Sequence, residues 1–148
     1  MKRFLVTILT LAAFASVSAA QPRALGVRGG YGVELSYQHN LNSNFIEADL
    51  GWAPKELNIV ATYDFVFANI GDFNFYAGPG VRVGSFETSN NVVGLNLGIA
   101  AQIGAEFIIP AVPINISLDW RPVVNFFGED KQRGFNGKYA ALGIRYRF

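Results

Sequence analysis

Apolar and polar residues alternate with a period of two through most of the chain after Gln21. In the segment VVGLNLGIAAQIGAEFII, residues 92–109, large apolar side chains take most odd positions and small or polar side chains take most even ones. The segments INISLDW (114–120) and LGIRYRF (142–148) alternate in the same way. Successive side chains of a β-strand point to opposite faces, and helical periodicity is nearly absent here. The pattern predicts an all-β chain whose strands have one oily and one polar face.

The direction of the oily face separates two kinds of barrel. A water-soluble barrel buries its aliphatic face, whereas a membrane barrel turns that face toward lipid. The polar face of this chain is rich in glycine, which suits the crowded interior of a narrow barrel better than a solvated surface. We therefore predict a transmembrane barrel, and a soluble exported barrel is the lesser alternative.

Aromatic residues gather near the expected strand ends, as the interface girdles of membrane barrels do. Two tryptophans fall at the expected outer side, and the other aromatics fall at the periplasmic side. The expected interface aromatics are Trp52, Trp120, Phe67, Phe73, Phe107 and Tyr146.

Turn signals divide the chain into eight strands if the sequence GGYG, residues 29–32, forms a tight turn, and into seven otherwise. Glycines there would supply the positive φ angles that tight hairpins use. Bacterial single-chain barrels have even strand numbers, which favours an eight-stranded antiparallel up-and-down barrel. We also expect a bulge at Pro79, because proline cannot donate to a neighbouring strand. The expected strands are Ala24–Gly30, Gly32–Asn40, Asn44–Trp52, Glu56–Ala68, Phe73–Phe86, Val92–Ile109, Val112–Val124 and Lys138–Phe148.

The lengths of the connections set an orientation. With both ends of the barrel domain in the periplasm, the turns NLNS (40–43), NIGD (69–72) and PAVP (110–113) lie on the periplasmic side, and all are short. The longest connection, FFGEDKQRGFNG (126–137), then lies outside. Outer-membrane barrels have short periplasmic turns and longer outer loops.

The ionisable residues fall mainly on the polar face, which would line the lumen. An eight-stranded barrel is just wide enough for its own side chains to fill it. Arginines and carboxylates on this face are nearly balanced, and unpaired charge in a poorly hydrated lumen is costly. We predict a salt-bridged plug, so that a passive pore is disfavoured. The residues expected to form it are Arg28, Glu34, Glu47, Asp49, Asp64, Arg82, Asp119, Arg121, Arg145 and Arg147.

The first twenty residues, MKRFLVTILTLAAFASVSAA, combine two cations, an apolar run and small residues before a cleavage point. This is the pattern of a secretory signal peptide, and its apolar run is shorter than the roughly 20 residues that a spanning helix needs. We expect residues 1–20 to be removed and residues 21–148 to form one barrel domain. Loss of Lys2 and Arg3 leaves the mature chain close to neutral, which disfavours nucleic acid as a partner.

Candidate chemistry is sparse. An outer-membrane lipid hydrolase or acyltransferase needs a nucleophile beside a base, usually serine and histidine. The chain has one histidine, His39, which is expected on the outward face near Ser43 and is more simply an interfacial residue. The chain has no cysteine, and neither metal-ligand spacing nor a phosphate-binding glycine loop occurs. We predict no catalytic, metal or cofactor site.

Four segments together resemble the small outer-membrane β-barrel proteins of Bacteroidota, which share the architecture of OmpA/OmpX-type eight-stranded barrels. They are GVRGGYGVELSYQH (26–39), YAGPGVRVG (76–84), PINISLDWRPVVNF (113–126) and the closing ALGIRYRF (141–148). The resemblance implies that Phe148 ends the signal read by the outer-membrane assembly machinery. It implies no catalytic motif.

These observations predict an integral outer-membrane protein, exported through the inner membrane, with membrane lipid and lipopolysaccharide around it. A non-enzymatic structural or surface-interaction role is the first hypothesis, and a monomer is expected. A narrow conduit for ions or small solutes and a lipid-modifying enzyme are the alternatives.

Overall fold

The computed structural model describes residues 23–128 and 133–148 of the chain, so the predicted signal peptide lies outside the described residues. Within these ranges all regular structure is β-strand, and no helix is long and apolar enough to cross a membrane. The strands are β1 (Arg23–Gly30), β2 (Val33–Leu41), β3 (Asn44–Ala53), β4 (Glu56–Ile70), β5 (Phe73–Glu87), β6 (Val93–Ile108), β7 (Ile114–Trp120), β8 (Val123–Phe127), β9 (Gly134–Asn136) and β10 (Ala140–Arg147).

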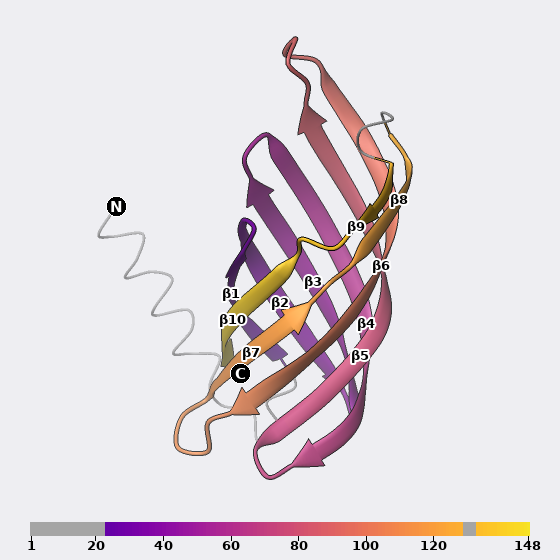
Figure 1. Cartoon of the computed structure of the whole chain (residues 1–148). Helices are drawn as coiled ribbons and strands as arrows, with labels where there is room; N and C mark the ends of the chain where they lie inside the picture. Colours follow the sequence, from indigo (N-terminus) through magenta and orange to yellow (C-terminus); the bar gives the residue numbers. More distant parts are fainter. Residues whose placement is uncertain (1–22, 129–132) are drawn as a thin grey trace, which may run out of the picture.

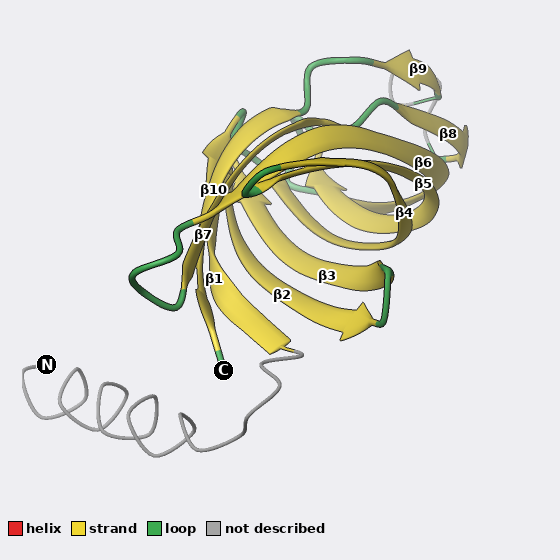
Figure 2. Ribbon diagram, turned by 90° about the horizontal axis from the view of Figure 1, so that it is seen from below, coloured by secondary structure: helices red, strands yellow, loops and turns green. Residues whose placement is uncertain are grey.

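The strands close into an eight-stranded antiparallel barrel (Figures 1 and 2). In the described chain, β7 and β8 both pair with β6 and together form one strand of the barrel. β9 pairs with β8 and β10 pairs with β7, so β9 and β10 together form the last strand of the barrel, and we call each of these eight barrel strands a stave. The ring closes where β1 pairs with β10, from Ala24 opposite Arg147 to Gly30 opposite Ala141. The predicted fold class is confirmed, and β1 and the end of β10 meet at one end of the barrel.

Buried and exposed side chains alternate along the strands, and the polar side chains are the buried ones, as the sequence predicted. Leu97 and Ile144 are 37% and 50% exposed on the outer surface, whereas Arg82 and Asp119 are 2% and 3% exposed inside. The exposed apolar side chains cover the outside of most strands, and they include Leu25, Val27, Leu35, Ile46, Ile59, Phe65, Val81, Val83, Ile99, Ile103, Leu118 and Leu142. A polar interior inside an apolar wall is the arrangement of a barrel surrounded by lipid.

The β1–β2 connection forms at GGYG as predicted, but the expected reason for its glycines is wrong. Among the described glycines, positive φ angles occur at Gly71, Gly128 and Gly134, and none lies in this turn. Gly30 and Gly32 instead allow close approach, because a Cβ on Gly30 would overlap the carbonyl oxygen of Ala140 and one on Gly32 would overlap that of Trp52. Glycine is needed here for space against neighbouring backbone.

The expected bulge at Pro79 is also wrong. Pro79 is exposed on the outer face and pairs in register with Ala101 of β6. On its other side, β5 pairs with β4, and two successive residue pairs are missing from this ladder next to Pro79. The pairs on either side of the gap, Thr62 with Gly80 and Phe65 with Ala77, have the same register, so no extra residue is inserted. The register shifts at Phe67, between Val66 and Ala68 of β4. The proline interrupts the ladder without inserting a residue.

Most strand limits differ from the expectation by one or two residues, the expected strand 112–124 is divided into β7 and β8, and two differences change the outer end of the barrel. The last stave was expected to begin at Lys138, but β10 begins at Ala140 and the short β9 forms inside the expected outer loop. β8 extends to Phe127, three residues beyond the expected end at Val124. Because β8 pairs with β9, the β-sheet on this side of the barrel extends farther toward the outer end than it does where β1 pairs with β10 (Figure 1).

Closure of the seam gives a first prediction. A Cβ on Gly26 of β1 would overlap the Ile144 carbonyl oxygen and lie 2.5 Å from the Arg145 Cα, whereas a Cβ on Gly29 meets nothing within 4 Å. We expect Gly26→Ala to lower the free energy of unfolding by about 2 kcal/mol or more, because backbone must move to admit the methyl group. Gly29→Ala is the matched control and should stay within about 0.5 kcal/mol of the parent.

Urea titration of the refolded barrel in detergent, followed by gel migration with and without boiling, measures both variants. Equal unfolding midpoints for the two alanine variants would contradict the close approach at Gly26.

Candidate functional site

The centre of the lumen is an ion-pair network, which we call the lumen plug, built from side chains of β1, β2, β3, β7 and β10 and of the link between β7 and β8. Glu47, which is fully buried, lies at its middle and accepts contacts from three arginines. Its Oε1 lies 2.8 Å from Arg121 Nη2 and 3.6 Å from Arg28 Nε, and its Oε2 lies 2.9 Å from Arg145 Nη2. The three guanidinium groups come from β1, from β10 and from the link between β7 and β8.

The remaining carboxylates of the plug complete the coordination of two arginines. Arg28 pairs with Glu34 and Asp119, and its Nη1 lies 3.4 Å from Asp49 Oδ2. Arg121 Nη2 lies 2.6 Å from the same Asp49 oxygen. Each of these arginines therefore has carboxylates on several sides, which is the condition under which a buried guanidinium is tolerated.

Neutral polar groups fill the spaces between the charges. Arg145 Nε donates to Ser36 Oγ at 2.8 Å, and its Nη1 donates to Ser117 Oγ at 2.8 Å. Arg121 Nε donates to Gln102 Oε1 at 2.6 Å, and the hydroxyl of Tyr76 donates to Asp119 Oδ2 at 3.2 Å. The plug is thus a continuous hydrogen-bonded network as well as a set of ion pairs.

A second, outer layer closes the lumen above the plug, and it depends on a residue that the sequence interpretation missed. Arg82 pairs with Glu56, and Arg82 Nη1 donates to Asn96 Oδ1 at 3.0 Å. The hydroxyl of Tyr139 donates to Glu56 Oε1 at 2.9 Å. Glu56 was expected as the first residue of its strand but was left out of the predicted ion-pair set. Its even position places it on the same inward face as Asp64, so the alternation already contained the signal.

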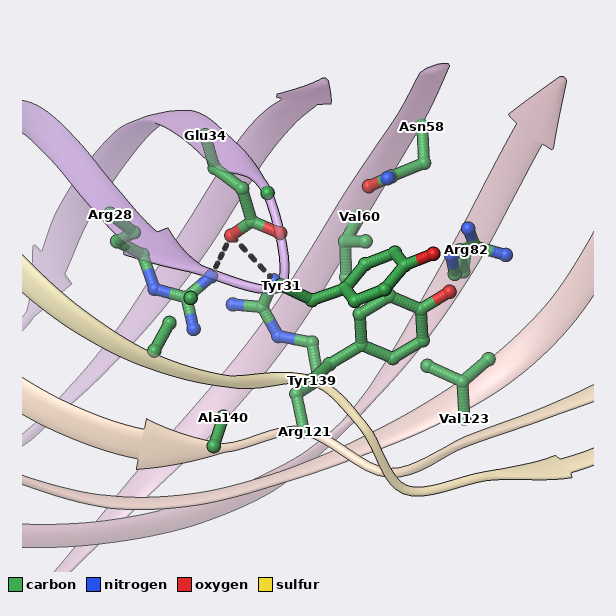
Figure 3. Close-up of a pocket in the computed structure, with 13 residues that line it drawn as sticks. Arg28, Tyr31, Glu34, Asn58, Val60, Arg82, Arg121, Val123, Tyr139 and Ala140 are labelled. Atoms are coloured by element: carbon green, nitrogen blue, oxygen red, sulfur yellow. Dashed lines mark hydrogen bonds and ion pairs between the residues drawn. The ribbon is translucent and has the colours of Figure 1, made fainter. Parts of the chain in front are cut away.

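An aromatic pair lies over this layer (Figure 3). The rings of Tyr31 and Tyr139 meet edge to face with centroids 5.8 Å apart, and Lys138 Nζ lies 3.8 Å from the Tyr31 ring centroid. Below Tyr139, the buried side chains of Val60, Ala100 and Val123 form a small apolar cluster inside the barrel. The GGYG turn therefore contributes part of the cover of the outer lumen.

The space left in the outer lumen is small. The cavity bounded by Arg28, Glu34, Arg82, Arg121 and Tyr139 has a volume of about 20 Å³. A single water molecule needs roughly 10–15 Å³ on this scale, so the cavity has room for about one water. Side chains fill this part of the barrel, as the width of eight strands requires.

Two members of the predicted ion-pair set lie in the lumen without a salt-bridge partner among the described residues. Asp64 is fully buried, and its Oδ2 accepts from Thr62 Oγ1 at 2.5 Å and from Gln102 Nε2 at 3.4 Å. Arg147 is half-buried at the end of the barrel where β1 begins. The other members of the set are brought together in the contacts given above.

The inner end of the barrel holds a larger cavity, which sequence reasoning did not find and which we call the amide cup. Its volume is about 320 Å³. Its lining is rich in carboxamides, with one carboxylate from Glu106 and one guanidinium from Arg147. The amides come from separate strands and turns, so no local motif marks them. They are Gln38, Asn40, Asn42, Asn44, Asn69, Asn74 and Asn115.

The six aromatics predicted at the membrane interfaces lie near the ends of their strands, and their contact with an interface stays a prediction. Trp52 and Trp120 are 49% and 43% exposed near the outer ends of β3 and β7, and Trp120 Nε1 donates to the Gly137 carbonyl at 2.8 Å. Phe73 and Phe107 pair across β5 and β6 with ring centroids 4.8 Å apart. The other two aromatics at this inner end are Phe67 on β4 and Tyr146 on β10.

His39 lies on the outer side of β2 and contacts an aromatic neighbour. Its Nδ1 is 3.4 Å from the Tyr37 hydroxyl, and the two rings stack with centroids 6.5 Å apart. Among residues 23–128 and 133–148, no group of three or more His, Cys, Asp or Glu side chains could hold a metal ion. The contacts of His39 shown here are with Tyr37, and its place at a membrane interface stays a prediction.

Comparisons with known proteins identify the fold and no family. No family model matches the chain, and no curated protein matches it. Among solved structures, the chain resembles Neisserial surface protein A (NspA) with a TM-score of 0.60 and 13% sequence identity. The match covers 85% of this chain and 93% of that one. At this identity the likeness is one of fold, and it agrees with the closed eight-stranded barrel described above.

Removal of the central charge of the plug gives a second prediction. Glu47→Gln leaves three buried guanidinium groups with one carboxylate fewer, and breaking a buried pair in this way costs about 3–5 kcal/mol. We expect a loss of about 3 kcal/mol or more in the free energy of unfolding. Glu87→Gln removes the same charge at an exposed position at the end of β5 and serves as the control.

The measurement is urea-induced unfolding of both variants in the same detergent. An unchanged stability of Glu47→Gln relative to Glu87→Gln would mean that the plug does not hold the barrel together.

Proposed function

We propose that the chain is a non-enzymatic integral protein of a bacterial outer membrane with a structural or surface-interaction role. The observation that carries the proposal is the inversion of the barrel, with an apolar outer wall around buried charges. Such a molecule in water would expose a large apolar surface, which soluble monomers avoid. A surrounding lipid bilayer explains why the outer face is apolar and why the charged side chains lie inside.

Three further observations support this location. The leader MKRFLVTILTLAAFASVSAA has the composition of an export signal, which an outer-membrane protein requires. The described connections on the side where β1 begins are short, as the periplasmic turns of such barrels are. NspA, a structural neighbour of similar fold, is by its name a surface protein. The segments that resemble small Bacteroidota barrels make that group our proposal for the chain's relatives.

The filled lumen favours a structural or interaction role over transport. The cavity of about 20 Å³ in the outer lumen and the plug beneath it offer no space for a solute. Partner recognition would therefore fall to surfaces outside this part of the lumen. We expect the assembly machinery to read the closing segment that ends at Phe148, where backbone N–H and C=O groups also pair with Arg23 across the seam.

The location is tested by fractionation of the native cell envelope together with gel migration. We expect the protein in the outer-membrane fraction, and we expect its unboiled form to migrate differently from its boiled form because a folded barrel resists SDS. Recovery in the soluble periplasmic fraction, or a band that never shifts on boiling, would contradict the proposal.

Conductance tests the filled lumen. We expect the purified barrel in a planar bilayer to give no current steps above the background of protein-free detergent, since charged side chains occupy the path. An outer-membrane porin measured in the same bilayer serves as the positive control. Reproducible steps from the refolded, heat-shifting protein would favour the conduit alternative.

A further inference from the structure

The amide cup has the form of a blind pocket. Its floor consists of buried side chains, with Ala24 at 3%, Phe45 at 2%, Gln38 at 3% and Asn115 at 2% exposure. Its rim includes the exposed Asn42 and Ser43 of the turn between β2 and β3 and the exposed Asn69 near the end of β4. A volume of about 320 Å³ lies at the lower limit of ligand pockets. The cup therefore suits a small molecule.

The floor is separated from the lumen plug. The rings of Phe45 and Tyr76 meet with centroids 5.0 Å apart and an interplanar angle of 73°. Beside them, Gln38 Nε2 donates to Glu47 Oε2 of the plug at 2.9 Å. A ligand entering from the inner end would thus meet a closed surface and not a channel.

The carboxylate in the cup is already satisfied. Glu106 Oε1 accepts from Asn74 Nδ2 at 2.9 Å, and Glu106 Oε2 accepts from Asn115 Nδ2 at 2.9 Å. Asn69 Nδ2 in turn donates to Asn74 Oδ1 at 2.5 Å. With both of its oxygens occupied by amide donors, Glu106 acts to orient the amides and does not present an open cation site.

The Arg147 guanidinium is half-buried in the lining of the cup. It interacts electrostatically with Glu106 but forms no salt bridge within residues 23–128 and 133–148. Asn115 uses its Nδ2 on Glu106 and on Gln38 Oε1, at 2.9 Å and 3.2 Å, and its Oδ1 is buried away from the surface of the cavity. The cup therefore offers a ligand a cation that has no salt-bridge partner in the described residues.

From these groups we infer that the amide cup is a binding site for a small carboxylate that also carries amide or hydroxyl groups. The ligand carboxylate pairs with Arg147, for which a planar guanidinium provides a two-point contact. An amide or hydroxyl group of the ligand hydrogen-bonds to the carboxamides that line the cup. Glu106 repels the ligand carboxylate and so directs it to the Arg147 side.

Two sources of this chemistry are distinguished by the choice of probes. N-acetylmuramic acid presents a carboxylate and an acetamide on a sugar ring, and N-acetyl-L-glutamate presents them on an amino-acid skeleton. N-acetylglucosamine has the sugar and the acetamide without the carboxylate. All three are small molecules, and they separate a saccharide ligand from a peptide-like one.

The experiment is calorimetric titration of the refolded barrel in detergent with each probe. We expect at least one of the two carboxylates to bind with a dissociation constant tighter than about 10 mM, and N-acetylglucosamine to bind at least about tenfold more weakly. Arg147→Gln should weaken the binding of that carboxylate by about tenfold or more, because a hydrogen bond to a charged group is lost. Arg23→Gln removes the same charge from an exposed residue at the same end, outside the lining, and should leave binding within about twofold.

Failure of both carboxylates to bind, equal binding of N-acetylglucosamine, or equal effects of the two arginine variants would each overturn the inference. The heat-dependent gel shift of every sample shows whether the barrel is folded. Binding to the refolded barrel does not depend on where the protein lies in the cell, so a failure here leaves the proposed membrane location untouched. That the cup faces the periplasm, however, rests on the proposed function.

Discussion

The pairing of buried guanidinium groups with carboxylates across the lumen is the interaction on which the rest of the barrel depends. The contacts of Glu47 join β3 to β1, to β10 and to the segment after β7, so they connect staves that share no backbone hydrogen bonds. A slip of one residue in any of these strands would turn a charged side chain to the outer face. The ion pairs therefore specify the register of the closed ring, whatever their net contribution to stability.

The glycines of the inner face complement the arginines. A narrow barrel has a fixed internal volume, so long guanidinium side chains need neighbours without side chains. A Cβ on Gly143 would lie 2.5 Å from Ser117 Oγ and 3.1 Å from Arg145 Nη1. A Cβ on Gly104 would lie 2.7 Å from the Tyr76 hydroxyl, which donates to Asp119 of the plug. The glycines of the polar face thus leave the space that the side chains of the ion-pair network occupy.

Sequence reasoning succeeded where a property repeats along a strand and failed where it arises between segments. The period of two placed Arg28, Arg121 and Glu47 on the inward face, and pairing across the ring brought them together. It could not reveal the amide cup, because its side chains converge from distant segments. It also misjudged Pro79, since a proline at an outward position interrupts hydrogen bonding without changing the register of β4 and β5. The shift at Phe67 has no local marker in the sequence.

The two ends of the lumen differ in how their polar groups are satisfied, and this difference decides where a ligand can bind. At the outer end Glu56 is shared among Arg82, Tyr139 and Lys138, whose Nζ lies 3.8 Å away, and little volume remains. At the inner end the amides satisfy Glu106, whereas Arg147 forms no salt bridge within residues 23–128 and 133–148 and lies beside an open volume. A cation without a salt-bridge partner in the lining of an open cavity can pair with an anion from outside the chain. The arginines of the plug are paired with carboxylates within the barrel, and the space beside them holds about one water.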